Sequence, residues 1–380
     1  MPHRNAGADM NTPACIMTSR SQAATVVSET DHIAADTAAR IFADLADLQT
    51  INRARDDDWK QPLWRALTDA GLPLAWVPEQ YGGSGASLAD GFEILSAAGR
   101  HACPIALAET MIAGWMLARA GIAAPAGAMT VAPVRPADRI VINPDGTLSG
   151  HAAGVPFAHG STHIAVLAAG DKGATVALVE TAACRLSEGR SLAGDPVSVA
   201  TFNRVKAIRS APAPAGLDQQ SFMLFGSTVR SVEAAGALES VLSLSVRYAK
   251  ERIAFERPIA KFQAVQQNLA RLAGEVAAAM AAAGSAADAV AQANAFDDMV
   301  LLEAASAKIR SAEAAAEGAA IAHQVLGAIG FTKEHVLHRF TLRLLSWRDD
   351  FGNESYWATT LGHLAARRGA DDFWPMIASR

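Results

Sequence analysis

The residues best suited to bind a charged ligand flank a predicted turn at Pro258. Arg252 and Phe255 precede the turn and Gln263 follows it, in the stretch YAKERIAFERPIAKFQAV at residues 248–265. Apolar residues recur at helical spacing upstream, so a long buried helix should place Arg252 near its C-terminal end, where a cation is favoured. Pro258 cannot continue that helix, so the chain must bend before a second helix begins. Arg252 and Gln263 are therefore expected on the same side of one turn, and the turn alone would fit an αα-hairpin in which both side chains cap helix ends.

A second segment, QVLGAIGFTKEH at residues 324–335, contains glycines that permit close approach of a backbone to a ligand. Together the two segments resemble the signature regions of flavin-dependent acyl-CoA dehydrogenases, and WVPEQYGGSG at residues 76–85 resembles that family's N-terminal helical domain. The resemblance covers roughly residues 35–365 and implies FAD as the cofactor. The residues that it assigns to FAD are Arg252, Phe255 and Gln263, which would hold the FAD of a neighbouring subunit, and Gln324, Gly327, Ala328 and Gly330, which would approach its pyrophosphate.

The resemblance also implies a reaction. In acyl-CoA dehydrogenases a carboxylate removes the α-proton of an acyl-CoA thioester, while the β-hydrogen leaves as hydride to the flavin on the opposite face. The implied partners are an acyl-CoA substrate, an electron-transfer acceptor, and identical or related chains in a dimer or tetramer. The implied activity is that of an oxidoreductase acting on a CH–CH bond.

The catalytic base is where the sequence departs most clearly from the family. Counting forward from the glycine segment, the usual glutamate falls on Phe351, within SWRDDFGNES. Some members place the base on the helix ahead of the signature, and that position is Gly226 here. Asp350 is the candidate base if the loop is shifted by one residue. The alternative is that Asp349 and Asp350 form a solvated pair near a helix terminus.

Motifs of the family's own flavin site are also altered. Residues 129–139 lack the flavin-contacting TEPxAGSD motif, and the tryptophan-containing flavin strand is replaced by GVPFAHG at 154–160, where Phe157 could still lie against a ring. Glu256 stands where the family usually has glycine. Residues that reach a partner's FAD thus remain, while those that build a subunit's own site are changed. This asymmetry favours the base-poor subunit of a heteromer, as in acyl-CoA dehydrogenases that act on steroid side chains or other bulky acyl groups.

Three functions stay open from the sequence. The first is a subunit that shares its active site with a related chain. The second is a self-sufficient homo-oligomeric dehydrogenase that uses Asp350 as its base. The third is a catalytically silent family member kept as an assembly or acyl-CoA-binding protein, because folding and subunit contact need neither a base nor a flavin.

Composition limits the class of protein. The 380 residues are 51% hydrophobic and 19% charged, as in globular proteins, and the net charge is −5 without a dense basic block, so nucleic acid is not an expected partner. No stretch approaches the ~20 uninterrupted apolar residues of a membrane span, so no membrane association is expected. Three cysteines without metal-ligand spacing, and the pair His335 and His338, predict neither a disulfide framework nor a metal site. A cytoplasmic localisation is expected.

The pattern of apolar residues and turn signals along the sequence predicts an α+β fold that is mainly α. Residues 1–30 read as a disordered extension, poor in large apolar side chains. The expected domains are an N-terminal α-helical domain at 31–123, a small middle β-domain at 124–214, and a C-terminal domain with a four-helix bundle at 215–380. Helices are expected at 34–48, 59–70, 87–100 and 105–120, and strands at 139–143, 164–167 and 175–179, with a turn at Asn143 to Gly146.

Overall fold

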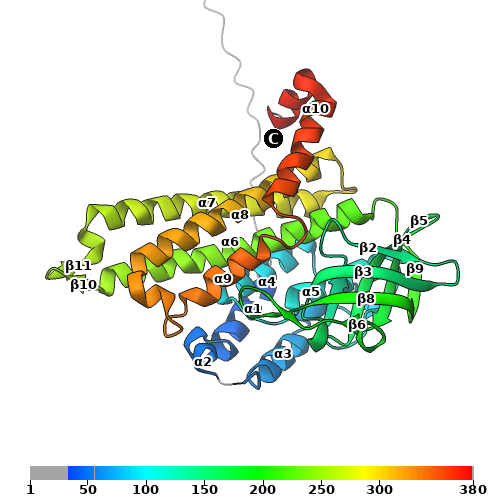
Figure 1. Cartoon of the computed structure of the whole chain (residues 1–380), viewed down its shortest axis with the longest axis horizontal. Helices are drawn as coiled ribbons and strands as arrows, with labels where there is room; N and C mark the ends of the chain where they lie inside the picture. The colour runs from blue at the N-terminus through cyan, green and yellow to red at the C-terminus, as the bar shows by residue number, and fades with distance from the viewer. Residues whose placement is uncertain (1–32, 55, 379–380) are drawn as a thin grey trace, which may run out of the picture. The chain divides into compact units, whose positions relative to one another are not determined.

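A computed structural model describes residues 33–54 and 56–378. Helices are followed by strands and then by helices again (Figure 1). The prediction of a mainly α, α+β fold is confirmed. The predicted extension at residues 1–30 lies outside the described residues. None of the described helices combines the length and the hydropathy that a membrane span requires.

The first helical region consists of α1 (Ile33–Leu45), α2 (Leu48–Arg53), α3 (Lys60–Asp69), α4 (Leu88–His101) and α5 (Leu107–Arg119), with short 3₁₀ turns η1 (Leu72–Leu74) and η2 (Glu79–Tyr81). The single helix expected at 34–48 ends earlier, because Asp47 caps a new helix by accepting a hydrogen bond from the Thr50 N–H at 2.9 Å. Ser87 and Asp90 form a reciprocal capping box that starts α4. The middle of α5 is buried throughout, so it is an internal helix rather than a surface one.

The strands form one sheet that packs against α5. Its members are β1 (Met129–Ala132), β2 (Arg139–Ile142), β3 (Thr147–Pro156), β4 (His163–Gly170), β5 (Gly173–Glu180), β6 (Arg185–Leu186), β7 (Gly189–Arg190), β8 (Pro196–Lys206) and β9 (Arg209–Pro212). The main order is β6-β8-β3-β2-β4-β5-β9; β1 pairs in parallel with β4, and β7 pairs with β8. The predicted turn at Asn143 joins β2 to β3, and Gly146 adopts the positive φ of 80° that this tight turn requires.

The last region is built on three long helices, α6 (Gln219–Glu251), α7 (Gln263–Gln292) and α8 (Asp298–Leu326), to which α9 (Leu337–Trp347) adds a fourth. The small strands β10 (Ile253–Ala254) and β11 (Arg257–Pro258) form a hairpin between α6 and α7. Helix α10 (Glu354–Ala378) packs on α8 and is interrupted at Gly369. Figure 1 shows the sheet at one end of α6 and the hairpin at the other.

Candidate functional site

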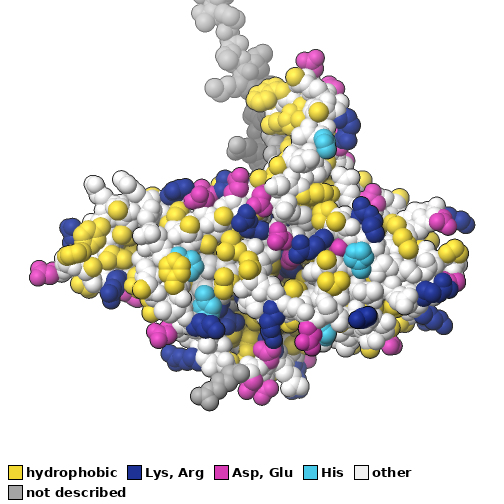
Figure 2. All heavy atoms as spheres, in the orientation of Figure 1, with side chains coloured by type: hydrophobic (Ala, Val, Ile, Leu, Met, Phe, Trp, Pro, Cys, Tyr) yellow, Lys and Arg dark blue, Asp and Glu magenta, His cyan; other side chains and the backbone are white. Residues whose placement is uncertain are grey.

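The hairpin end of the bundle exposes the first group of predicted cofactor residues. Helix α6 ends at Glu251, and Arg252 is its exposed C-cap residue. Phe255 is 90% exposed, although its ring meets the edge of Phe262 at 6.2 Å between centroids. Gln263 begins α7 and is also exposed. Hydrophobic side chains gather on the surface at this end, over β10 and β11 (Figure 2). An exposed aromatic ring and an exposed guanidinium on the same short hairpin segment are suited to a ligand that carries both a ring and a phosphate.

The hairpin shows why glycine is favoured at position 256, where this chain has Glu256. Phe255 and Glu256 both have left-handed backbones, with φ of 51° and 63°. Glycine adopts this conformation without steric cost, which gives a physical reason for the family's glycine at this position. The sequence indicated only the charge of Glu256 and not this strain.

We expect Glu256→Gly to stabilise the protein by up to about 1 kcal/mol, because relief of left-handed strain exceeds the added freedom of the unfolded chain. Urea unfolding monitored by circular dichroism measures the change. Glu256→Ala is the matched control, since it removes the charge and keeps the strain. Equal stabilisation by both variants would assign the effect to charge and contradict the backbone explanation.

The second group of predicted cofactor residues lies at the end of α8. Gln324, Gly327 and Ala328 are exposed, whereas Gly330 is buried. Gly327 has φ 64°, and a Cβ added to it would have no atom within 4 Å, so its backbone faces open space. A Cβ on Gly330 would lie 3.0 Å from Leu326 Cβ, so that glycine serves internal packing. The exposed backbone of Gly327 and Ala328 fits the close approach of a phosphate group.

The two positions at which the family places a base are in contact here, and neither has a carboxylate. Phe351 is 0% exposed, and its backbone N–H donates to the Val134 carbonyl at 2.8 Å. A Cβ built on Gly226 would lie only 2.2 Å from Phe351 Cδ1. The ring therefore fills the space that a side chain at position 226 would need. A larger residue at either position requires the other to move.

Aromatic packing continues from Phe351 into the interior between α5 and α6. The Phe222 ring meets the Phe351 ring at 6.0 Å with an interplanar angle of 79°. One turn along α6, Phe225 stacks on Trp115 of α5 at 3.8 Å and 5°. All four side chains are buried. On the side that faces Phe222 and α5, the Phe351 ring is thus packed in an apolar core.

Asp350 lies in a buried ion-pair cluster centred on Arg230. The Arg230 Nε atom is 3.0 Å from Asp350 Oδ2, and its Nη1 is 2.6 Å from Glu233 Oε2. Its Nη2 pairs with Glu109 of α5. The side chain of Arg230 is 3% exposed and that of Asp350 is 18% exposed. The interpretation of Asp350 as half of a solvated pair is therefore wrong, although Asp349 is exposed as that interpretation required.

Burial sets the protonation of the groups around Arg230. Burial raises the pKa of Glu233 to about 7, and Arg230 opposes that rise. Burial also lowers the pKa of Lys308 of α8 to about 8, with the nearby Asp350 opposing it. Lys308 Nζ donates to the Trp347 carbonyl at the end of α9. The cluster thus joins α5, α6, α8 and the segment before Phe351 through charged groups removed from water.

The raised pKa of Glu233 predicts a loss of stability with rising pH. Folding favours the protonated carboxyl, so its contribution is fully present below pH 4.5, the ordinary value, and is lost as pH rises through about 7. The expected loss is about 3 kcal/mol, and Glu233→Gln should remove it. Urea unfolding of both proteins across this range tests the prediction. If the free energy of unfolding changed with pH by the same amount in both proteins, Glu233 would not titrate in this way.

A cavity of about 250 Å³ borders both Asp350 and Arg230, between the sheet and the end of α9. Phe157 and Arg135 line it from the strand region, and Trp347, Asp349 and Asp350 line it from the other side. The structure thus brings together the replaced strand segment and the candidate base. Among residues 33–54 and 56–378, no group of three or more His, Cys, Asp or Glu side chains is arranged to hold a metal ion.

Comparison with known proteins identifies the family. A sequence model of the acyl-CoA dehydrogenase N-terminal domain matches residues 28–124, and one of the acyl-CoA dehydrogenase C-terminal domain matches residues 219–353. The chain belongs to the acyl-CoA dehydrogenase family. Acyl-CoA dehydrogenases are FAD-dependent oxidoreductases that act on the CH–CH bond of an acyl-CoA, so the predicted enzyme class and cofactor are confirmed at the level of the family.

Individual relatives share most of this length. Acyl-CoA dehydrogenase IpdE2 of Mycobacterium tuberculosis is 28% identical over 292 residues, which cover 76% of this chain and 82% of the relative. A structure of a variant of the Tcur3481–Tcur3483 steroid ACAD is 26% identical, with a TM-score of 0.77 over 88% of this chain and 97% of that chain. The ChsE4–ChsE5 complex from Mycobacterium tuberculosis has the same fold, with a TM-score of 0.77 at 23% identity over 89% of this chain and 97% of that chain.

Proposed function

We propose that this chain is the base-poor subunit of a heteromeric acyl-CoA dehydrogenase, in which a related partner chain supplies the catalytic base. The observation that carries the proposal is the buried ring of Phe351 at the base position, packed against Gly226. Arg252, Phe255 and Gln263 are exposed at the hairpin between α6 and α7, and we propose that they serve the cofactor site of another subunit. Similarity to a steroid ACAD made of two named proteins supports a heteromer.

In this proposal the chain's residues bind and orient the cofactor of the partner. Arg252 would pair with a phosphate of FAD, the exposed Phe255 would cover an apolar part of it, and the backbones of Gly327 and Ala328 would receive its pyrophosphate. Bound FAD supplies the hydride acceptor for α,β-dehydrogenation. A bulky acyl-CoA, such as one with a steroid side chain, is the substrate class favoured by the steroid ACAD resemblance. An electron-transfer protein then reoxidises the complex.

Asp350 remains the alternative base, because it borders the 250 Å³ cavity. Its carboxylate is held by Arg230 at 3.0 Å, which stabilises the ionised form but restricts its movement towards a substrate. We propose that this pairing is structural. A self-sufficient homo-oligomer would need Asp350 to leave Arg230 or to work while paired with it.

Turnover of Asp350→Asn separates the two functions. In the flavin-loaded complex, this variant should keep its dehydrogenation rate within about threefold of the wild type, whereas loss of a general base costs about 10²–10⁴-fold. Asp349→Asn, which changes the exposed neighbour, is the matched control. A fall in the dehydrogenation rate of about 10²–10⁴-fold in Asp350→Asn, without such a fall in Asp349→Asn and with flavin still bound, would refute the proposed base-poor role.

A further inference from the structure

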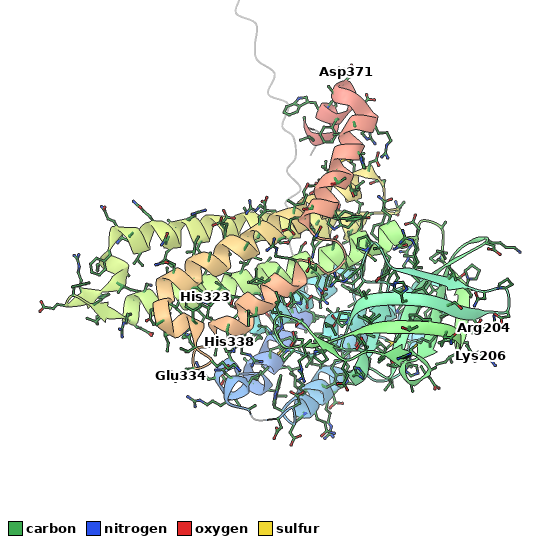
Figure 3. The ribbon with its side chains drawn as sticks, in the orientation of Figure 1. Arg204, Lys206, His323, Glu334, His338 and Asp371 are labelled. Carbon is green, nitrogen blue, oxygen red and sulfur yellow. The ribbon has the colours of Figure 1, made fainter. Side chains whose placement is uncertain are left out.

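His323 packs against the turn that contains Gly327 and Gly330. It lies near the end of α8, and its ring stacks on Phe331 in η6 (Gly327–Phe331), with centroids 4.6 Å apart and planes at 30°. Its Nε2 atom is 3.0 Å from Thr341 Oγ1 on α9. Figure 3 shows His323 and His338 where α8 and α9 approach each other. One side chain therefore links α8, η6 and α9.

The hydrogen bonds around this ring fit a neutral histidine with its proton on Nε2. The Thr341 hydroxyl lies 3.4 Å from the Leu337 carbonyl, to which it donates, so it accepts from His323 Nε2–H. The Nδ1 atom is buried and has no hydrogen-bond partner. A Cβ added to Gly330 would be 3.4 Å from Nδ1, so this nitrogen lies directly beside the turn. A second proton on Nδ1 would be placed against Gly330.

The surroundings oppose that second proton. Burial lowers the pKa of His323, and the charge of His338 on α9 lowers it further, while the Gly330 backbone acts in the opposite direction. The residues of α8 within one turn of His323, and all residues of η6, are uncharged. The loop before α9 contains three further titratable residues, Lys333, Glu334 and His335, of which the first two are exposed.

We propose that His323 is a positioning residue for FAD, which in its neutral form holds the Gly327–Phe331 turn in the shape that receives the partner's pyrophosphate. This inference rests on the proposed function. A Cβ added to Gly327 would face open space, whereas Gly330 and Phe331 at the other end of the turn contact His323, so these contacts help to hold the shape of the turn. Protonation of His323 should disturb the turn and weaken FAD binding.

The test is the dissociation constant of FAD from the assembled, flavin-loaded complex, measured by flavin fluorescence over mildly acidic to neutral pH. His323→Ala should weaken binding about tenfold at neutral pH, since it removes a hydrogen bond and a ring contact. His323→Gln retains a donor for Thr341 and does not titrate, so binding should stay near wild type at neutral pH and lose the weakening in acid. His363→Gln, which replaces an exposed histidine of α10, is the matched control and should keep the wild-type pH profile of FAD binding.

Two results would overturn the inference. One is FAD affinity in His323→Ala equal to wild type, and the other is the same pH profile for wild type and His323→Gln. Either leaves the proposed function intact, because the wild-type complex still binds FAD. A wild-type complex without flavin would instead overturn the proposed function and this inference with it.

Discussion

Replacing Arg252 by alanine is expected to weaken FAD binding by the assembled complex about 100-fold. Arg252 is exposed at the end of α6, and a charge-assisted contact with a phosphate contributes about 1.5–3 kcal/mol. The stability of the chain should change by less than about 0.5 kcal/mol, because no ion pair or side-chain hydrogen bond involves Arg252 in the described residues. A large effect on cofactor affinity without an effect on folding is the signature of a binding residue.

Lys250→Ala is the control for this experiment. Lys250 is an exposed cation in the last turn of the same helix, so it tests whether general positive charge at the hairpin end is sufficient. Arg252→Lys keeps the charge and loses the planar guanidinium, and it should give an intermediate affinity. Equal FAD affinity in wild type and Arg252→Ala would show that this end of the bundle does not hold the cofactor.

Replacing Arg230 by alanine is expected to destabilise the protein by about 3–5 kcal/mol, the largest effect on stability that we predict. The substitution leaves Glu109, Glu233 and Asp350 without their shared cation in a site where Arg230 itself is 3% exposed. Uncompensated buried charge costs much more than the lost pairs are worth. Chemical unfolding monitored by circular dichroism measures the change.

Two further variants keep this prediction testable if Arg230→Ala does not fold. Arg230→Met combined with Glu109→Gln, Glu233→Gln and Asp350→Asn removes the charges together and should recover most of the lost stability. Arg100→Ala is the matched control, because Arg100 pairs with Glu239 at 2.7 Å with both side chains more than 40% exposed. That variant should cost less than about 1 kcal/mol. Similar decreases in the free energy of unfolding for Arg230→Ala and Arg100→Ala would contradict the account.

Local patterns were sufficient to predict much of the fold. The apolar period of α6, the proline after it and the turn before β3 each depend on residues close together in sequence. The position count that led to Phe351 and Gly226 also selected two residues that the fold places in contact. Their functional assignment stays a prediction, because contact alone does not show what either residue does.

The sequence did not reveal the features that depend on distant pairs. Glu109 and Arg230 come from different helices far apart in the chain, and only the fold brings them together. A possible signal was the presence of Arg230 and Glu233 in an otherwise uncharged stretch of α6, because buried charges need partners. The left-handed backbone of Glu256 and the stacking of His323 on Phe331 likewise follow from the folded structure and not from any local sequence pattern.

The most direct test of a shared active site is the visible absorbance spectrum of the purified chain, expressed alone and together with a related acyl-CoA dehydrogenase chain from the same genome. The account predicts flavin bands in the co-purified complex and none in the chain alone. The reason is that the residues proposed to hold FAD belong to a cofactor site that is completed by another subunit. Flavin bands of equal strength in the chain alone would contradict it and indicate a self-contained site beside Asp350. Absence of flavin from both preparations would contradict it as well and leave a catalytically silent assembly protein.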